Sequence, residues 1–171
     1  MFPTISWNLI TLEILMAAVL VVLVALDLLL PKDTRRDWLG NVSIASVFGL
    51  LIFWLTQHDL TGATFNNTFV MDSFAWFFKG FFLLAMFFVL VMTQQYFKSI
   101  ALRINAFYFL LWLAAIGMCL IASSTDFLVL FISMEIMTLS FYVMTAYLKT
   151  DKLSIEAGMK YLILGALSSG L

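Results

Sequence analysis

Three ionisable side chains lie inside the apolar runs of residues 124–171 in this 171-residue sequence: Glu135, Glu156 and Lys160. A charge at membrane depth is costly, so an ionisable residue there indicates a functional site. A carboxylate and a lysine in apolar surroundings can take up and release protons, which is the chemistry of a proton path. We therefore predict that these three residues form a proton relay and that the rest of the chain positions them.

Glu135 is the most central of the three. It lies about nine residues, or ~14 Å by helical rise, from the start of the apolar run 126–148. A continuous polar stripe on one helical face is predicted from the residues that follow it at three- and four-residue steps, namely Thr138, Tyr142, Thr145 and Lys149. We interpret the stripe as the lining of a hydrated proton route. The alternative is a structural carboxylate, held protonated by burial or hydrogen-bonded to its neighbours.

Glu156 and Lys160 are four residues apart with the glutamate first, the favoured order for a helical ion pair. Lys160 lies about seven residues, or roughly 10 Å, inside a helix that opens near Leu153. The pair is either part of the relay or a glutamate that holds a snorkelling lysine at the interface. Regular helices leave Glu135 and Lys160 offset by about 11 Å, too far for a direct ion pair. We therefore predict that a lysine beyond Leu171 is the partner of Glu135.

Two further charges are weaker candidates for the relay. Lys79 lies about six residues into the apolar run 73–94, where snorkelling to the membrane surface is the simpler interpretation. Glu13 lies about one and a half turns into the first apolar run and is a candidate partner for Lys79.

Asp126 is predicted to cap the helix that carries Glu135. His58 stands alone beside a helix end, so we expect an interface residue and no metal site.

Composition identifies the elements that must position these residues. The chain is 64% hydrophobic and 11% charged, with a mean hydropathy of +1.07, whereas soluble domains are about one quarter charged. The single cysteine excludes an intrachain disulfide. We predict an all-α integral membrane protein, a polytopic bundle of about six transmembrane helices, with a polar loop over 58–72. The expected spans are 7–30, 39–57, 73–94, 105–121, 126–148 and a sixth that opens near 153.

The basic residues between the spans predict an orientation. Seven of them fall in alternate loops, Lys32, Arg35, Arg36, Lys98, Arg103, Lys149 and Lys152, and the other loops hold none. The positive-inside rule then places the amino terminus outside and runs the odd-numbered helices inward. The first run lacks a positive n-region and a cleavage site, so we interpret it as a mature span.

The run FLVLFISMEIMTLSFYVMTAY, a short basic loop and the run SIEAGMKYLILGALSSGL together resemble the antiporter-like membrane subunits of respiratory complex I. The resemblance is closest to the subunit N type, the relative of mitochondrial subunit 2. It implies a fold of about 14 helices with an inverted pair of five-helix repeats. Residues 1–104 would then be three leading helices, and 105–171 the start of the first repeat. It also implies that Glu135, Lys160 and the preceding Glu156 are the relay residues of helices five and six.

The implied function is that of a proton-translocating subunit of NADH:quinone oxidoreductase, in which quinone reduction elsewhere drives proton pumping through a buried Glu/Lys relay. The chain itself would hold no cofactor. NAD, FMN, iron–sulfur clusters and quinone would belong to partner subunits of a hetero-oligomer in a bacterial inner membrane, with no nucleic acid involved. The alternatives are a subunit of a multisubunit sodium/proton antiporter or of a membrane-bound hydrogenase, and a structural membrane module without a proton path.

Overall fold

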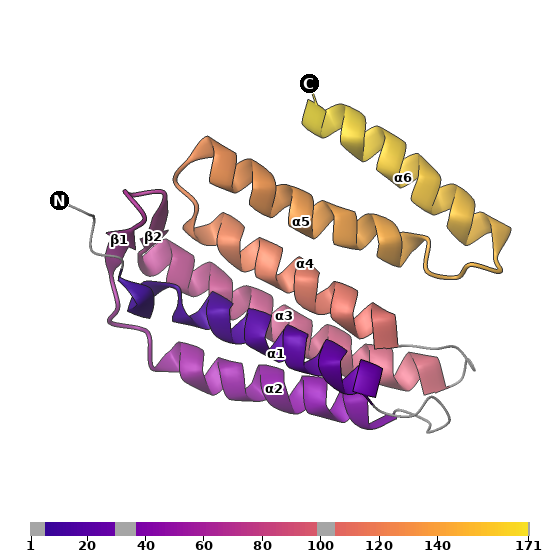
Figure 1. The fold of residues 1–171 in the computed structure, drawn as a ribbon, viewed down its shortest axis with the longest axis horizontal. Helices are drawn as coiled ribbons and strands as arrows, with labels where there is room; N and C mark the ends of the chain where they lie inside the picture. The colour runs from indigo at the N-terminus through magenta and orange to yellow at the C-terminus, as the bar shows by residue number, and fades with distance from the viewer. Residues whose placement is uncertain (1–5, 30–36, 99–104, 171) are drawn as a thin grey trace.

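The computed structural model describes residues 6–29, 37–98 and 105–170. Within these ranges a short 3₁₀ turn, η1 (Trp7–Leu9), leads into α1 (Thr11–Leu29) and α2 (Asp37–Leu55). Two short strands, β1 (Gly62–Thr64) and β2 (Phe69–Met71), precede the long helix α3 (Ser73–Lys98). The chain continues through α4 (Asn105–Ser123), α5 (Phe127–Thr145) and α6 (Lys152–Gly170). Figure 1 shows the helices lying side by side as a bundle, with α6 outermost beside α5.

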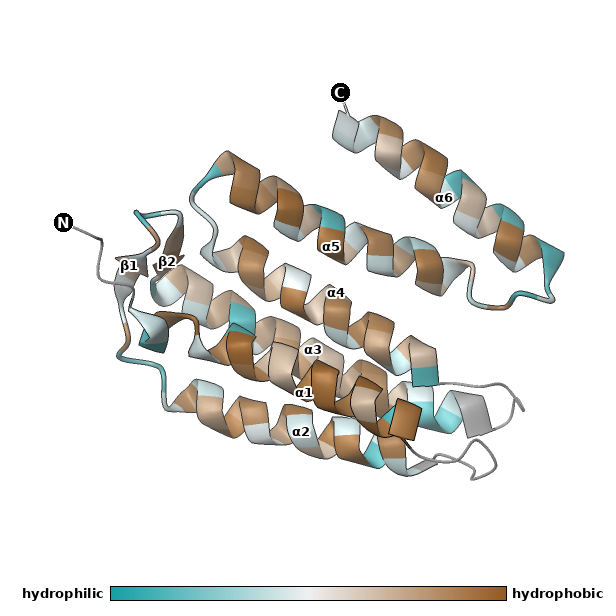
Figure 2. Cartoon of the chain, in the orientation of Figure 1, coloured by the Kyte–Doolittle hydropathy of each residue, from teal (hydrophilic) through white to brown (hydrophobic). Residues whose placement is uncertain are grey.

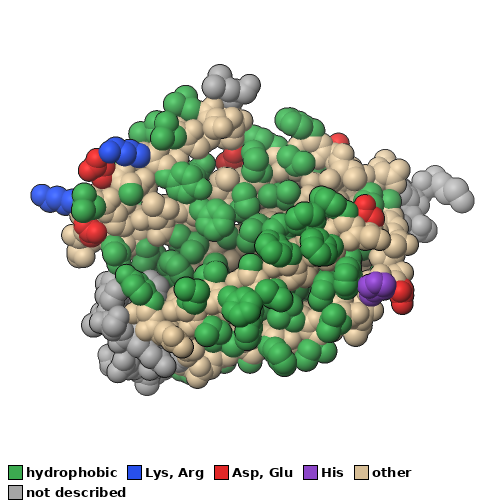
Figure 3. All heavy atoms as spheres, turned by 180° about the vertical axis from the view of Figure 1, so that it is seen from behind, with side chains coloured by type: hydrophobic (Ala, Val, Ile, Leu, Met, Phe, Trp, Pro, Cys, Tyr) green, Lys and Arg blue, Asp and Glu red, His purple; other side chains and the backbone are tan. Residues whose placement is uncertain are grey.

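The predicted all-α membrane fold is confirmed. Five of the described helices are long and apolar enough to cross a membrane: α1, residues 38–55 of α2, residues 73–96 of α3, α4 and α5. Helix α6 forms where a sixth helix was expected, but it carries three charged residues, Lys152, Glu156 and Lys160, and is not one of the five. Figure 2 shows these hydrophilic positions in its first half. Apolar side chains cover most of the face of the bundle seen in Figure 3, and most of its charged side chains lie toward the two ends.

Helix α4 lies at the centre of the packing. On one side Leu111, Trp112 and Cys119 are buried in a core shared with α1, α2 and α3. On the other side Gly117 admits α5: a Cβ at this position would lie 2.8 Å from the Met137 nitrogen and 2.9 Å from the Ser133 oxygen. The two backbones are therefore in direct contact. Trp112 is fully buried, so this tryptophan packs in the interior of the bundle instead of lying at the membrane interface.

The predicted polar loop contains a β-hairpin that the sequence did not predict. Strands β1 and β2 pair antiparallel, with Gly62 opposite Met71 and Thr64 opposite Phe69. The turn places Phe65, Asn66 and Asn67 at positive φ, a conformation in which asparagine is enriched. Hydrogen bonds attach the hairpin to neighbouring segments: Ser6 N donates to Thr64 Oγ1 (3.1 Å) and Thr125 N to Thr68 O (3.1 Å). The hairpin thereby covers the end of the bundle where α1, α3 and α5 begin (Figure 1).

Helix α5 is shorter than expected. It was predicted to extend to residue 148 but ends at Thr145, with Ala146 as its C-cap. The following residues form turns in which Lys149 N donates to Tyr147 O (3.0 Å). The apolar residues 146–148 continued the hydrophobic pattern, so hydropathy alone extended the helix by three residues. The other end agrees with expectation, because the Asp126 side chain caps α5 by accepting from Leu128 N (2.9 Å) and Val129 N (3.4 Å).

Two glycines let α6 lie against α5. A Cβ on Gly158 would meet the Ala146 side chain at 2.4 Å and its Cα at 3.0 Å, and a Cβ on Gly165 would fall 1.9 Å from the Tyr142 hydroxyl. Helix α6 is therefore closely packed against the end of α5 and the residue after it at these two positions.

A larger residue at Gly158 should separate the two helices. We expect Gly158→Leu to lower the free energy of unfolding by ~1–3 kcal/mol through overpacking, measured as the thermal unfolding midpoint of the full-length protein in its native assembly. Gly49→Leu is the matched control, because nothing lies within 4 Å of a Cβ there. Equal shifts for both variants would contradict the proposed contact.

Candidate functional site

Glu135 occupies the middle of α5. It is the ninth of 19 residues, so it lies about 12 Å from the first residue of the helix and about 15 Å from the last. Its side chain is half-buried, and the Oε1 atom is fully buried without a hydrogen-bond partner among the described residues. A buried polar atom without a partner is uncommon in folded proteins and calls for a functional or structural explanation. The predicted central and unpaired position of Glu135 thus agrees with its surroundings.

Helical geometry gives the side of α5 from which the Glu135 side chain projects. Seven residues, or nearly two turns, separate it from Tyr142, so the two side chains leave α5 on the same side. That side bears α6, because Tyr142 contacts Tyr161 ring to ring (centroids 4.7 Å apart) and lies beside Gly165. The opposite side, with Ser133 and Met137, contacts α4 at Gly117. The carboxylate therefore faces away from the core formed by α1–α4.

The predicted polar stripe is only partly present. Thr138 and Thr145 donate their hydroxyl protons to carbonyls of their own helix, Glu135 O (3.3 Å) and Phe141 O (2.8 Å). Tyr142 is buried between α5 and α6. The extension of the stripe to Lys149 was wrong, because α5 ends four residues earlier and Lys149 lies in the turn beyond it. The stripe therefore ends within the helix.

Glu156 and Lys160 form the predicted ion pair. Lys160 Nζ lies 2.6 Å from Glu156 Oε1, and both side chains are more than half exposed, at 69% and 59%. Ser154 fixes the start of this helix by donating to Thr145 O (2.8 Å). The pair is therefore accessible at the end of the bundle where α5 leads into α6.

The contacts between α5 and α6 give the spacing of the two sites. Gly158 lies against Ala146, and the helices run in opposite directions. Lys160, two residues past Gly158, is then level with about residue 144, nine residues from Glu135. That offset is about 14 Å along the helices, close to the value predicted from helical rise. A direct Glu135–Lys160 ion pair is excluded at this spacing.

Lys79 and Glu13 form a second ion pair in the interior. Lys79 Nζ lies 2.6 Å from Glu13 Oε1, and their side chains are 0% and 4% exposed. The suggested pairing is confirmed, and the snorkelling interpretation of Lys79 is wrong: its ammonium group stays inside the bundle. Neither Glu13 oxygen has a well-directed hydrogen bond among the described residues. Charge, more than hydrogen-bond geometry, therefore holds this carboxylate.

Sequence reasoning missed two residues that complete the environment of Lys79. Its Nζ also donates to Met71 Sδ (3.3 Å) and lies 4.8 Å from the centre of the Phe69 ring. Both residues belong to β2, so the unpredicted hairpin supplies them. A thioether and an aromatic face stabilise a cation weakly without adding charge. One buried lysine therefore joins α1, α3 and the hairpin.

His58 lies outside both sites. Its Nδ1 is 3.0 Å from Asp59 Oδ1, and its ring meets Trp76 edge-on at 4.8 Å between centroids. In the described parts of the chain, no three His, Cys, Asp or Glu residues lie close enough together to bind a metal ion.

Comparison with known proteins identifies the relatives of this chain. Residues 124–171 match the family described as "NADH:quinone oxidoreductase/Mrp antiporter, TM". NADH-quinone oxidoreductase subunit N from Heliobacterium modesticaldum is 34% identical over 97% of this chain, and that from Desulfitobacterium hafniense is 36% identical over 96%. The predicted family resemblance is confirmed. The chain spans about a third of the length of these relatives, 35% and 33% respectively.

The fold is shared with a solved structure. A chain of respiratory complex I from Thermus thermophilus, determined with bound aureothin, matches 93% of this chain with a TM-score of 0.77 and 22% identity. This chain covers 34% of that one. The family segment 124–171 includes Glu135, Glu156 and Lys160, whereas Glu13 and Lys79 precede it.

The buried pair can be tested through stability. Lys79→Met leaves the Glu13 carboxylate buried without a counter-charge, so we expect a loss of ~3–5 kcal/mol in the free energy of unfolding. The double variant Glu13→Leu with Lys79→Met should recover most of that loss, since apolar replacement of a whole buried pair is near neutral. Denaturation of the full-length protein in detergent measures both values. The matched control is Asp59→Asn in the exposed His58–Asp59 pair, which should cost less than ~1 kcal/mol.

Proposed function

We propose that this chain forms part of a proton-translocating membrane subunit of an NADH:quinone oxidoreductase. The observation that carries the proposal is the half-buried carboxylate of Glu135 in the middle of an apolar helix long enough to span a membrane, with Oε1 buried and without a hydrogen-bond partner among the described residues. The similarity to subunit N proteins over nearly the whole chain supports it. A carboxylate in this position can hold either a proton or a negative charge, and the balance depends on which charges approach it.

The strength of charge–charge interactions indicates which groups can change the protonation of Glu135. Two unit charges 14 Å apart interact by only about 1 kcal/mol at an effective dielectric constant of 20, compared with about 4 kcal/mol at 4 Å. Lys160 therefore influences Glu135 weakly. A cation that moves next to Glu135 would change its protonation strongly. The relatives extend well past the length of this chain, and the proposal assigns the partner lysine to a helix that follows Leu171.

The other candidate relay residues can be placed along a proton route that leads to Glu135. Glu156 and Lys160 are exposed at the basic end of the bundle, where proton uptake from solution is feasible. Thr138, Tyr142 and Thr145 lie between that end and Glu135 on α5. Thr138 and Thr145 already donate to the helix, so their oxygens can accept hydrogen bonds from water. Water would therefore have to connect Lys160 with Glu135.

The proposal places the electron chemistry elsewhere. NAD, FMN, iron–sulfur clusters and quinone would be bound by other subunits of the hetero-oligomer, and quinone reduction would act on Glu135 through changes of charge. The basic loops would face the inside of a bacterial inner membrane and the hairpin the outside, in keeping with the positive-inside rule.

Replacing the central carboxylate tests this function. Glu135→Gln removes the exchangeable proton while keeping the shape of the side chain, so we expect proton pumping per NADH oxidised to fall in reconstituted vesicles. Ser140→Ala is the matched control: Ser140 is buried in the same helix and its hydroxyl donates to Ile136 O (2.8 Å), so its loss should leave pumping intact. Unchanged pumping by a fully assembled Glu135→Gln complex would refute the assignment and leave a structural module as the explanation.

The Glu13–Lys79 pair requires a separate experiment. The pair is either a second protonation site or an ion pair that fixes α1 on α3. The Glu13→Leu, Lys79→Met double variant separates these roles because it should assemble. We expect reduced pumping if the pair relays protons, and normal pumping with normal assembly if it only fastens the helices.

A second function deserves testing because the matched family description also names the Mrp antiporter. A sodium/proton antiporter subunit would need the same mid-membrane carboxylate. The two functions differ in their driving force. Proton movement by purified full-length assembly should follow NADH oxidation in the first case, and an imposed sodium gradient without NADH in the second.

A further inference from the structure

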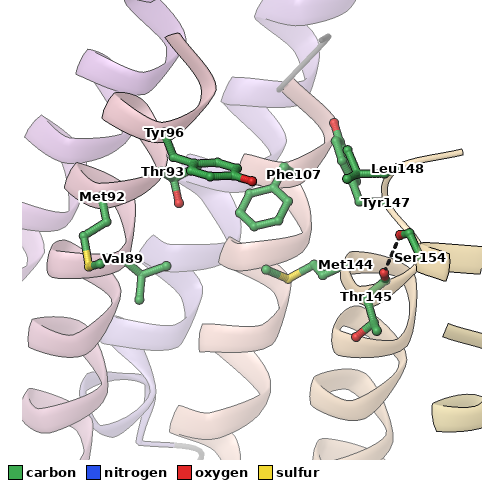
Figure 4. Close-up of a pocket in the computed structure, with 10 residues that line it drawn as sticks. All are labelled: Val89, Met92, Thr93, Tyr96, Phe107, Met144, Thr145, Tyr147, Leu148 and Ser154. Carbon is green, nitrogen blue, oxygen red and sulfur yellow. Dashed lines mark hydrogen bonds between the residues drawn. The ribbon is translucent and has the colours of Figure 1, made fainter. Parts of the chain in front are cut away.

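A cavity of about 460 Å³ lies at the basic end of the bundle, between α3 on one side and α4, α5 and the start of α6 on the other. Its walls are mostly apolar: Val89 and Met92 come from α3, Phe107 from α4, and Met144 and Leu148 from α5 and the turn after it. Figure 4 shows the α3 side chains facing those of α4 and α5 across this space. The cavity serves neither Glu135 nor the Glu13–Lys79 pair, since none of these residues lines it.

The cavity lining is mostly apolar, with some hydroxyl groups along it. Along α3 it extends from Val89 to Tyr96, seven residues or about 10 Å, with Tyr96 nearer the basic end. Tyr96 and Tyr147 lie toward that end in Figure 4, whereas Thr145 and Ser154 lie further along the lining. Burial raises the pKa of Tyr147 above its ordinary value, so its phenol is neutral. An occupant must therefore combine an apolar tail with a polar head.

The charged residues near the mouth of the cavity indicate the charge of the occupant's polar head. Lys149 follows the lining residue Leu148, and Lys152 lies two residues before Ser154; both side chains are exposed. The acid of this turn, Asp151, accepts a hydrogen bond from Leu153 N (3.0 Å) at the start of α6. Lysines beside a membrane surface attract anionic lipid headgroups.

The combination of apolar walls and basic residues near the mouth favours a lipid over a helix of another protein as the occupant. An acyl chain suits the apolar lining, and an anionic headgroup suits the nearby lysines. Lipid is also the solvent that surrounds this part of α3, where Met92 and Tyr96 are 69% and 61% exposed.

We propose that this cavity binds one acyl chain of an anionic phospholipid, with the headgroup phosphate held by Lys149 and Lys152. The cavity shares Thr145 with the proposed proton route, but lipid binding there does not require the proposed function to hold. Its position between α3 and the α5–α6 turn means that bound lipid would fill the space beside the segment carrying Glu156 and Lys160.

Photocrosslinking of the assembled complex tests the proposal. The complex with its full-length subunit is placed in nanodiscs containing phosphatidylglycerol or phosphatidylcholine with a photoreactive acyl chain, and adducts are mapped by mass spectrometry. We expect phosphatidylglycerol adducts on residues 144–148 to exceed phosphatidylcholine adducts. Lys149→Gln with Lys152→Gln should lower that preference by roughly fivefold per lysine, the equivalent of ~1 kcal/mol each.

Filling the cavity supplies the second test. Met144→Trp should abolish the adduct, whereas Val143→Trp should keep it because Val143 is 53% exposed on another side of α5. Val89→Phe, on the opposite wall, should act like Met144→Trp if that variant fails to assemble. Equal labelling by both lipids, labelling that survives the filled cavity, or a cavity without lipid adducts because protein covers it would each overturn the proposal.

Discussion

A carboxylate inside a bilayer needs a proton, a cation or hydrogen bonds, because no bulk water is there to solvate it. The bundle contains two such carboxylates, and they differ in how this need is met. Glu13 has Lys79 at 2.6 Å in an interior that excludes solvent from both. Glu135 has a buried oxygen with no partner among the described residues. The first charge is compensated within the chain, and the second has no counter-charge in ion-pair contact among the described residues.

Helix α4 explains why the two carboxylates are separated. One of its sides packs into the core shared with α1–α3, near the Glu13–Lys79 pair, and Gly117 on another side brings the α5 backbone into contact. Since Ser133 and Met137 occupy that contact, Glu135 must leave α5 in the opposite direction, toward α6. The interior pair fastens the leading helices and the hairpin, while the side of α5 that carries Glu135 remains turned outward from this core.

Much of this arrangement could be predicted because hydropathy in a bilayer leaves few alternatives. The five spans and the Asp126 cap follow from length, composition and local hydrogen bonding. The pairing of Glu13 with Lys79 followed from their similar depths, although 66 residues separate them. The burial of this pair could not be predicted, because Phe69 and Met71, which cover Lys79, belong to a strand of only three residues. Such strands are too short for a periodic pattern, and only the Asn66-Asn67 turn could have indicated them. The end of α5 at Thr145 was missed for a related reason, since apolar residues 146–148 hide the turn.

The two lysine–glutamate pairs show why distance alone assigns no role. Both measure 2.6 Å, yet one is 0% and 4% exposed and the other 69% and 59%. An exposed pair contributes little stability and exchanges protons freely with water. A buried pair can exchange only if the structure opens, and breaking it is costly. Under the proposed function, protons would enter beside the exposed Glu156 and Lys160, whereas a role for the buried Glu13 and Lys79 would require the structure to open around Lys79. The offset of about 14 Å between Lys160 and Glu135 would then have to be bridged by water or by a charged residue outside the described ranges.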